Sequence, residues 1–288
     1  MNLHQRIAGY GRKLSKTEQV LVEEMQARYP QSLLESATAL ARLVGTSAST
    51  VVRLLAKLGY ESYAQAQMEA RAEVTARLAS PGERADVVGS DKPSPRACLH
   101  NALLHDQHNL KETYASIDVA AFEAAVRLLT QRRGRVHVLG LRQGAPLASH
   151  VALYLNLCLP SVKPMVAAGP LFLEDQLLWI DEADVLLAFT FRRYSVAAAN
   201  AVKYFRQRGG KVILITDSAS APAAASAHHV LIARSSSASP FDSYTAAFSV
   251  CNALLAAVAQ RSKQALGAAL ERGEGLWDAQ WIRPPGAQ

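Results

Sequence analysis

From Arg135 onwards, short apolar runs alternate with helical stretches, and this alternation constrains the fold more than any other feature of the sequence. Each run has the length and composition of a buried strand. Parallel strands require a crossover connection, usually a helix, so the pattern predicts an α/β domain with a five-stranded parallel sheet flanked by helices. The expected strands are Val136–Leu139, Val162–Val166, Asp184–Phe189, Lys211–Thr216 and Val230–Ala233.

The N-terminal part of the chain has a different hydrophobic pattern, in which apolar residues recur only with helical spacing. Ser15 and Glu18 form a capping box at the start of one helix, and Tyr29-Pro30 ends it. We therefore predict an all-α domain joined to the α/β domain. The expected boundaries are 1–78 for the helical domain, 79–95 for a linker rich in Pro, Gly and Ser, 96–272 for the α/β domain, and 273–288 for an irregular tail.

Within the helical domain, the segment Thr38–Gly59 has the pattern of a helix-turn-helix. Ala41 allows two helices to cross closely, and Gly45 suits the tight turn between them. Hydroxyl groups at the start of the second helix and cations along it can reach the bases and phosphates of duplex DNA. A plain helical bundle that binds protein is the alternative. The expected DNA-binding residues are Thr38, Ser47, Ser49, Thr50, Arg53 and Lys57.

The net charge of +7 is compatible with an anionic partner, either a nucleic acid or a phosphorylated metabolite. Residues 1–78 carry +3 of this charge and the rest of the chain carries +4, so the excess is denser in the helical domain. A basic soluble protein without an anionic partner can have a similar net charge. Charge alone therefore does not show whether this chain binds an anionic partner.

In an open parallel sheet, ligands bind at the carboxyl ends of the strands. Three segments occupy this position: Gly140–Gly144, Thr190–Ser195 and Thr216–Ser218. Guanidinium groups and hydroxyls in these segments fit a phosphate or a carboxylate, although the Arg192-Arg193 pair can also be read as surface charge. The expected ligand-binding residues are Gly140, Arg142, Gln143, Gly144, Thr190, Arg192, Arg193, Ser195, Ser239 and Ser243.

Catalytic and cofactor motifs are not evident. The segment GLRQG lacks the second glycine of a dinucleotide-binding loop, so we expect no nicotinamide cofactor. Asp181, Glu182 and Asp184 are read as a solvated turn, and His228-His229 as ordinary loop residues. The cysteines Cys98, Cys158 and Cys251 are far apart, which disfavours disulfides and structural zinc. We expect no catalytic residues, no metal, no membrane partner and a cytoplasmic location.

Taken together, the motifs LSKTEQVLVEEM, ALARLVGTSASTVVRLLAKLGYESYAQ, VHVLG, DVLLAFT and RGGKVILITDS resemble the RpiR/MurR type of bacterial transcription regulator. Such regulators join an N-terminal helix-turn-helix domain to a C-terminal SIS (sugar isomerase) domain that binds phosphosugars. This sequence departs from the family pattern at the ligand loops. Arg142 and Gly144 replace a Gly and a Ser of GxGxS, and Arg192-Arg193 replace Ser-Gly of SxSGxT, while Thr190 and Ser195 keep the outer hydroxyls.

The resemblance implies a regulator that binds a double-stranded DNA operator and responds to a small anionic effector, a phosphosugar or an organic acid. It also implies a homodimer or a homotetramer. A sugar-phosphate isomerase with an appended helical domain is the alternative function. It requires a general base at the pocket, and the sequence offers no clear candidate for one.

Overall fold

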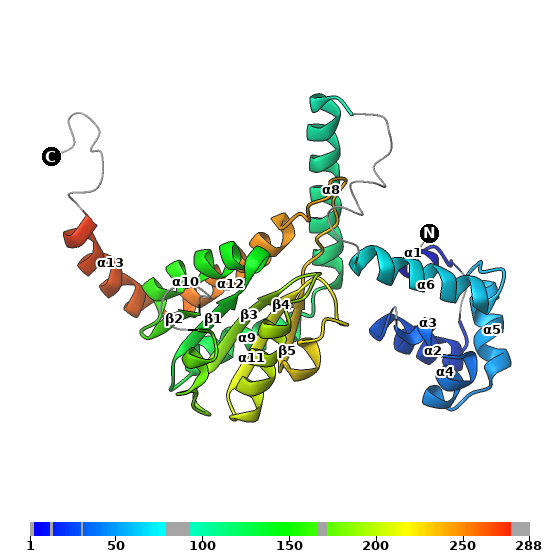
Figure 1. Ribbon diagram of the computed structural model, residues 1–288, viewed down its shortest axis with the longest axis horizontal. Coiled ribbons are helices and arrows are strands. Elements are labelled where there is room, and N and C mark those ends of the chain that lie inside the picture. The colour runs from blue at the N-terminus through cyan, green and yellow to red at the C-terminus, as the bar shows by residue number, and fades with distance from the viewer. Residues whose placement is uncertain (1–2, 12–13, 30, 79–92, 166–171, 278–288) are drawn as a thin grey trace. The chain divides into compact units, whose positions relative to one another are not determined.

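The computed structural model describes residues 3–11, 14–29, 31–78, 93–165 and 172–277 (Figure 1). Most of the expected linker, residues 79–92, and the last residues of the expected tail, 278–288, lie outside the described residues, as does Val166. The chain divides into two compact units, Met1–Lys92 and Pro93–Gln288. We refer to them as the N-terminal unit and the C-terminal unit.

The described part of the N-terminal unit is helical around one apolar core. Leu21 and Met25 of α2 pack with Leu40 of α4 and with Leu54 and Leu55 of α5. The predicted capping box is confirmed at the start of α2, where Ser15 and Glu18 satisfy each other's backbone N–H groups. The helices are α1 (Leu3–Ala8), α2 (Lys16–Ala27), α3 (Gln31–Leu34), α4 (Ala37–Val44), α5 (Ala48–Lys57) and α6 (Tyr63–Leu78).

The C-terminal unit contains the predicted five-stranded parallel sheet, with strand order β2-β1-β3-β4-β5. The central strands alternate their side chains between two apolar cores, one on each face of the sheet. The strands are β1 (Val136–Gly140), β2 (Val162–Met165), β3 (Val185–Thr190), β4 (Lys211–Thr216) and β5 (His229–Ile232).

Helices cover both faces of this sheet, as the alternating sequence predicts (Figure 1). Helices α9, α10 and α12 pack on one face, and α11 packs on the other together with two 3₁₀ turns, η2 (Asp175–Leu177) and η3 (Ala224–Ser226). The helices of this unit are α8 (Pro95–Ser116), α9 (Val119–Gln131), α10 (Ala145–Cys158), α11 (Val196–Gln207), α12 (Thr245–Arg261) and α13 (Lys263–Trp277).

Helix α13 corrects the expectation of an irregular tail from Gly273, because the helix continues to Trp277. Alanine, leucine and glutamate favour a helix here strongly enough to outweigh three glycines. Gly273 is buried, and a Cβ atom at this position would lie 2.4 Å from the Trp277 ring. This glycine therefore makes room for the tryptophan instead of ending the helix.

In the described part of the chain, no single helix is long and apolar enough to cross a membrane. The pair α4 and α5 passes such a test on combined length and composition, but it is bent by 102° at the turn between the two helices.

Candidate functional site

The helices α4 and α5 are joined by a short turn at which Gly45 takes a left-handed backbone conformation (φ 70°). Ser36 caps the start of α4, and Ser47 caps the start of α5. The 102° angle between the two helices lies within the range of about 90–120° found in helix-turn-helix motifs. The geometry is thus compatible with a helix-turn-helix domain.

The start of α5 presents a cluster of hydroxyl groups to the outside of the unit. The Ser47 hydroxyl accepts a hydrogen bond from the Thr50 backbone N–H (3.2 Å) and lies 2.8 Å from the Ser49 hydroxyl and 2.9 Å from the Thr50 hydroxyl. Arg53 is exposed one turn further on, and its Nε donates to the Ser49 carbonyl (3.3 Å). Thr38 is exposed on α4. All of these groups are accessible to a ligand.

Lys57 differs from the other residues expected to bind DNA, because it already has an anionic partner. Its Nζ lies 2.6 Å from Glu18 Oε1. Hydrogen bonds from Lys57 and from the Ser15 backbone lower the pKa of Glu18 to about 2. The pair connects the end of α5 to the start of α2, so Lys57 positions α5 within its own unit.

In the C-terminal unit, four loops meet at the carboxyl edge of the sheet: residues 140–144, 190–195, 216–218 and 234–245. We call them the carboxyl-edge loops. The first requires Gly140, because a Cβ atom there would lie 2.2 Å from the Gly144 carbonyl oxygen. A Cβ atom at Gly144 would lie 3.0 Å from the Phe189 carbonyl oxygen, so this loop folds back closely against the end of β3.

Arg192 is held by carboxylates from two other carboxyl-edge loops. Its guanidinium donates from Nε to Asp242 Oδ1 (2.6 Å) and makes a second bond to the same oxygen from Nη2. The Arg192 backbone N–H donates to Asp217 (3.3 Å), which also accepts a bond from the Tyr194 hydroxyl (2.9 Å). Burial acts to lower the pKa of Arg192, but the hydrogen bonds and charge of Asp242 outweigh it and the pKa is raised. Asp242 therefore balances the charge of Arg192.

Arg142 and Arg193 are the two expected cations that stay exposed at this edge. Within the described residues neither forms an ion pair. Both have left-handed backbone conformations, with φ of 52° and 57°. This conformation costs a residue with a side chain about 1 kcal/mol, so the surrounding loops must hold both arginines in place. Gln143 is exposed between Arg142 and the buried Gly144.

The expected hydroxyl residues differ in whether they already have a hydrogen-bond partner. Thr190 is buried, and its Oγ1 has no such partner in the described part of the chain. The three serines each have one. Ser195 caps α11 by accepting a bond from the Ala198 N–H (3.3 Å). Ser239 bonds to the carbonyl (3.0 Å) and the N–H (3.1 Å) of Phe241, and Ser243 donates to Asp106 of α8. Thr190 is thus the hydroxyl at this edge that most needs a polar partner.

Three polar residues of α8 hold the last carboxyl-edge loop. Asn109 binds Ser236 through its amide, with Nδ2 2.7 Å from the Ser236 carbonyl oxygen. Thr113 accepts a bond from the Arg234 N–H (2.9 Å), and Asp106 accepts one from the Thr245 hydroxyl (2.8 Å). Sequence analysis missed these contacts, because Asn109 and Ser236 are 127 positions apart.

Asp184, at the opposite edge of the sheet, is not the solvated residue that the sequence suggested. Asp184 is buried, where it accepts hydrogen bonds from the Arg135 N–H (2.6 Å) and the Asp181 N–H (3.2 Å). It also lies 3.2 Å from His137 Nε2. Burial lowers the pKa of His137 even though Asp184 acts to raise it. These contacts hold the starts of two strands together, away from the carboxyl edge.

His228 also differs from an ordinary loop residue. Its Nδ1 accepts a hydrogen bond from the Val212 N–H (3.0 Å), and this bond ties the approach to β5 to β4. Burial and the nearby charges of Arg206 and Lys211 lower its pKa to about 4. The ring is therefore neutral at neutral pH and serves as a hydrogen-bond acceptor.

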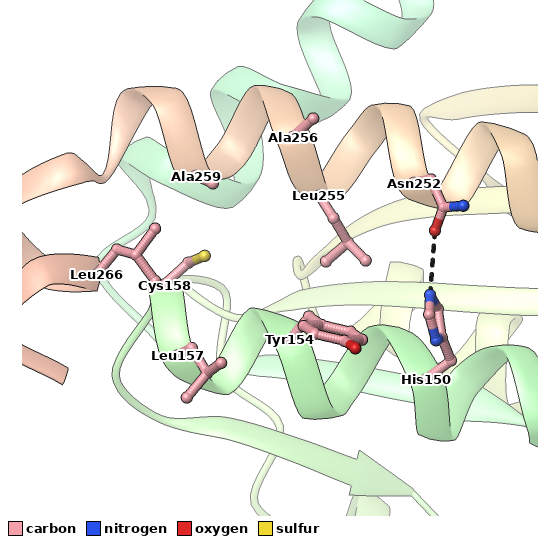
Figure 2. A pocket seen from close by; sticks show the side chains of 9 residues that line it. All are labelled: His150, Tyr154, Leu157, Cys158, Asn252, Leu255, Ala256, Ala259 and Leu266. Atoms are coloured by element: carbon pink, nitrogen blue, oxygen red, sulfur yellow. Dashed lines mark hydrogen bonds between the residues drawn. The ribbon is translucent and has the colours of Figure 1, made fainter. Parts of the chain in front are cut away.

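An apolar groove lies between α10, α12 and α13 (Figure 2). No residue of the carboxyl-edge loops is among those that line it. Figure 2 shows Leu255 and Tyr154 pointing into it and His150 bonded to Asn252 at one end, with Nε2 3.2 Å from Oδ1. No group of three or more metal-ligating side chains occurs in the described part of the chain.

Comparison with known proteins identifies the C-terminal architecture. Residues 128–257 match the SIS domain family. The C-terminal unit contains a SIS domain. Its match begins in α9 and ends in α12, so it includes the whole sheet and all four carboxyl-edge loops.

Two solved structures with TM-scores above 0.5 are similar to this chain. The sugar isomerase domain of an RpiR transcription factor from Sphaerobacter thermophilus is 26% identical, with a TM-score of 0.58, over 62% of this chain and 98% of that one. The Vibrio vulnificus NanR protein complexed with ManNAc-6P is 16% identical, with a TM-score of 0.54, over 98% of this chain and 100% of that one. The latter match shows a shared fold along nearly the whole chain. Among curated proteins none matches this chain.

Proposed function

We propose that this chain is an RpiR-type transcriptional regulator that binds operator DNA through α4 and α5 and senses a small anionic metabolite through its SIS domain. The observation that carries the proposal is the exposed, hydroxyl-rich start of α5, set at 102° to α4 across a left-handed glycine, in the same chain as a SIS domain. The likeness of the C-terminal unit to the sugar isomerase domain of an RpiR transcription factor supports the assignment of the SIS domain to a regulator. The fold shared with the NanR protein along nearly the whole chain supports the combination of the two units. The regulator would act in the cytoplasm as a homodimer or a homotetramer.

In this proposal the start of α5 enters the major groove. Ser47, Ser49 and Thr50 contact bases or phosphates there, with Thr38 contacting the backbone from α4. Arg53 provides the main phosphate contact of α5. Lys57 contributes less because Glu18 already neutralises it.

The effector in this proposal is a phosphosugar or a sugar-derived acid, bound at the carboxyl edge of the SIS domain. Arg142 and Arg193 supply the unpaired positive charge, and Thr190 Oγ1 supplies a hydroxyl that has no partner within the described residues. A guanidinium group can form paired hydrogen bonds with either a phosphate or a carboxylate. The arginines that stand where the family has small residues are therefore compatible with either kind of effector.

The Arg192–Asp242 pair offers a route from this site to the DNA-binding unit. An anion at the carboxyl edge competes with Asp242 for Arg192, and Asp242 lies in the loop that Asp106, Asn109 and Thr113 of α8 hold. Helix α8 directly follows the segment between the two units in sequence. A shift of this loop would therefore change the position of the helix that leads to the N-terminal unit.

We further propose that the chain is not an enzyme. Aldose–ketose isomerisation requires a general base at the substrate, and the carboxyl-edge loops contain no Glu or His. Their carboxylates, Asp217 and Asp242, are both engaged with Arg192. The alternative of a sugar-phosphate isomerase predicts measurable turnover of aldose or ketose phosphates by the purified protein.

The decisive experiment measures DNA binding and effector binding together. Retention of fragments from the protein's own promoter region is measured across a salt series, with and without phosphosugars and sugar acids. We expect salt-sensitive retention that the effector changes, and calorimetry should show DNA changing effector affinity by the same factor. DNA retention that no metabolite alters, or metabolite binding without coupling, would contradict the sensing mechanism.

The Arg193→Ala variant separates the two sites. It should weaken effector binding while DNA retention without effector stays unchanged, because Arg193 lies in the SIS domain. Loss of DNA retention in this variant would show that its effect is not confined to the ligand site.

A further inference from the structure

Helix α8 is oriented with its polar side toward its own unit and its apolar side outward. Asn109 and Thr113 are buried against the 234–245 loop. Leu99 and Leu103, in contrast, are 62% and 55% exposed, and Tyr114 is 87% exposed. A helix at the surface of a monomer normally has the reverse arrangement. This inversion indicates a second apolar surface that covers α8.

Four of the five large apolar residues exposed on α8 form one stripe with a symmetric spacing. Leu99, Leu103, Leu110 and Tyr114 follow one another at intervals of 4, 7 and 4 residues. These intervals keep all four side chains on one face of an α-helix. They also read the same in both directions, so an antiparallel copy of the helix places Leu99 opposite Tyr114 and Leu103 opposite Leu110.

An apolar groove adjoins the C-terminal half of this stripe. Leu110 and Tyr114 of α8, Phe122 of α9 and Val250 of α12 are among the residues that line its volume of about 230 Å³. The N-terminal half of α8, which carries Leu99 and Leu103, extends beyond the sheet (Figure 1). One half of the helix therefore presents protruding leucines, and the other half presents a cavity that accepts them.

We propose that the stripe and the groove form an antiparallel homodimer interface, in which Leu99 and Leu103 of one copy fill the groove beside Leu110 and Tyr114 of the other. The contact is isologous, so each copy contributes one set of leucines and one groove. The same register places Arg96 of one copy opposite Ile117, the residue that follows α8, in the second copy.

The length of α8 suits a helix-on-helix contact between two copies. Its 22 residues extend about 33 Å, and the groove walls from α9 and α12 widen the contact surface beyond this single helix. This interface rests on the homodimer of the proposed function and assigns a surface to it, and a dimer that binds no DNA leaves the interface intact.

The first test compares two substitutions of adjacent leucines in the full chain. Leu103→Glu places a charge in the interface of both copies, whereas Leu104→Glu alters a similarly exposed leucine (49%) that faces about 100° away. Sedimentation equilibrium should show a dimer for the wild type and for Leu104→Glu. For Leu103→Glu the dissociation constant should rise on the order of 100-fold, because the charge enters the symmetric contact twice. Circular dichroism checks that both variants are folded.

The second test fixes the direction of pairing, with Cys98→Ser as the background that removes the exposed native thiol. A mixture of Leu103→Cys and Leu110→Cys proteins should form a mixed disulfide dimer on mild oxidation. Neither variant should cross-link efficiently to itself, since seven residues separate the two positions along the helix. Self-linked Leu103→Cys would contradict the antiparallel pairing.

Two results would overturn the interface as a whole. A wild-type chain that stays monomeric at micromolar concentration means that another part of the same chain covers the stripe. A dimer that tolerates both Leu103→Glu and Leu110→Glu means that the copies meet elsewhere. DNA retention measured in parallel shows independently whether the proposed function holds.

Discussion

The two regions to which we assign the proposed function are assembled over very different distances in sequence. In the α4–α5 region, Ser47 caps its own helix and bonds to residues within three positions. At the carboxyl edge of the SIS domain, Arg192 pairs with Asp242, 50 positions away. The contrast shows why sequence motifs describe the first region well and the second one poorly. The motif residues at the carboxyl edge are present, but distant residues set their charge and exposure.

The largest effect that tests this comparison is expected for Gly140→Val. The new side chain collides with the Gly144 backbone, because even a Cβ atom would lie 2.2 Å from the Gly144 carbonyl oxygen. We expect the free energy of unfolding of the SIS domain to fall by about 3 kcal/mol. Urea unfolding followed by circular dichroism measures it.

Gly267→Ala is the matched control, since nothing lies within 4 Å of its Cβ position in α13. It should leave stability unchanged or raise it by up to about 1 kcal/mol. Equal losses for both glycines would mean that the close packing of the first carboxyl-edge loop has no particular importance.

The next largest effect is expected for Asp242→Ala, which leaves the mostly buried guanidinium of Arg192 without its main partner. We expect a loss of about 2 kcal/mol in the unfolding free energy. The double variant with Arg192→Met should recover part of this loss, because it removes the unpaired charge. The double-mutant cycle measures the coupling, and a coupling near zero would contradict the ion pair as a structural link between the loops.

A smaller effect, of about 1 kcal/mol in DNA binding, is expected for Arg53→Ala. Loss of one phosphate contact should lower the slope of log K against log salt by about 1. Lys57→Ala should lower it less, since Lys57 is already paired with Glu18. Retention of promoter fragments across a salt series measures both slopes. A larger effect at Lys57 than at Arg53 would mean that a different face of α5 meets the DNA.

The smallest effect concerns the acid response of the N-terminal unit. The pKa of Glu18 is lowered from 4.5 to about 2 in the folded state, so the unfolded chain binds the proton more readily. The stabilisation is therefore complete well above pH 4.5 and is lost as the pH falls from about 4.5 toward 2. Urea midpoints measured between pH 6 and pH 3 should fall less steeply for Glu18→Gln than for the wild type. Parallel pH profiles would contradict this assignment.

Much of the fold was predictable because its determinants are local. The capping box at Ser15 and Glu18 was confirmed, as was the parallel sheet expected from the alternating apolar runs. Helix α13 was not expected, because the glycines in its sequence suggested an irregular tail. The packing of Trp277 on Gly273 explains why one of them is tolerated in the helix. The assignments of DNA-binding and ligand-binding residues stay predictions that the experiments above address.

The sequence by itself determined the order of helices and strands, the layers around the sheet and the turn between α4 and α5. These features depend on periodicity, capping and turn chemistry within a few residues, all of which can be read directly from neighbouring positions. Only the tertiary structure decided that Arg192 is neutralised, that Arg142 and Arg193 remain free of ion pairs within the described residues, and that α8 turns its leucines outward. Charge balance and burial depend on which distant segments return to the same place, and no local pattern specifies that.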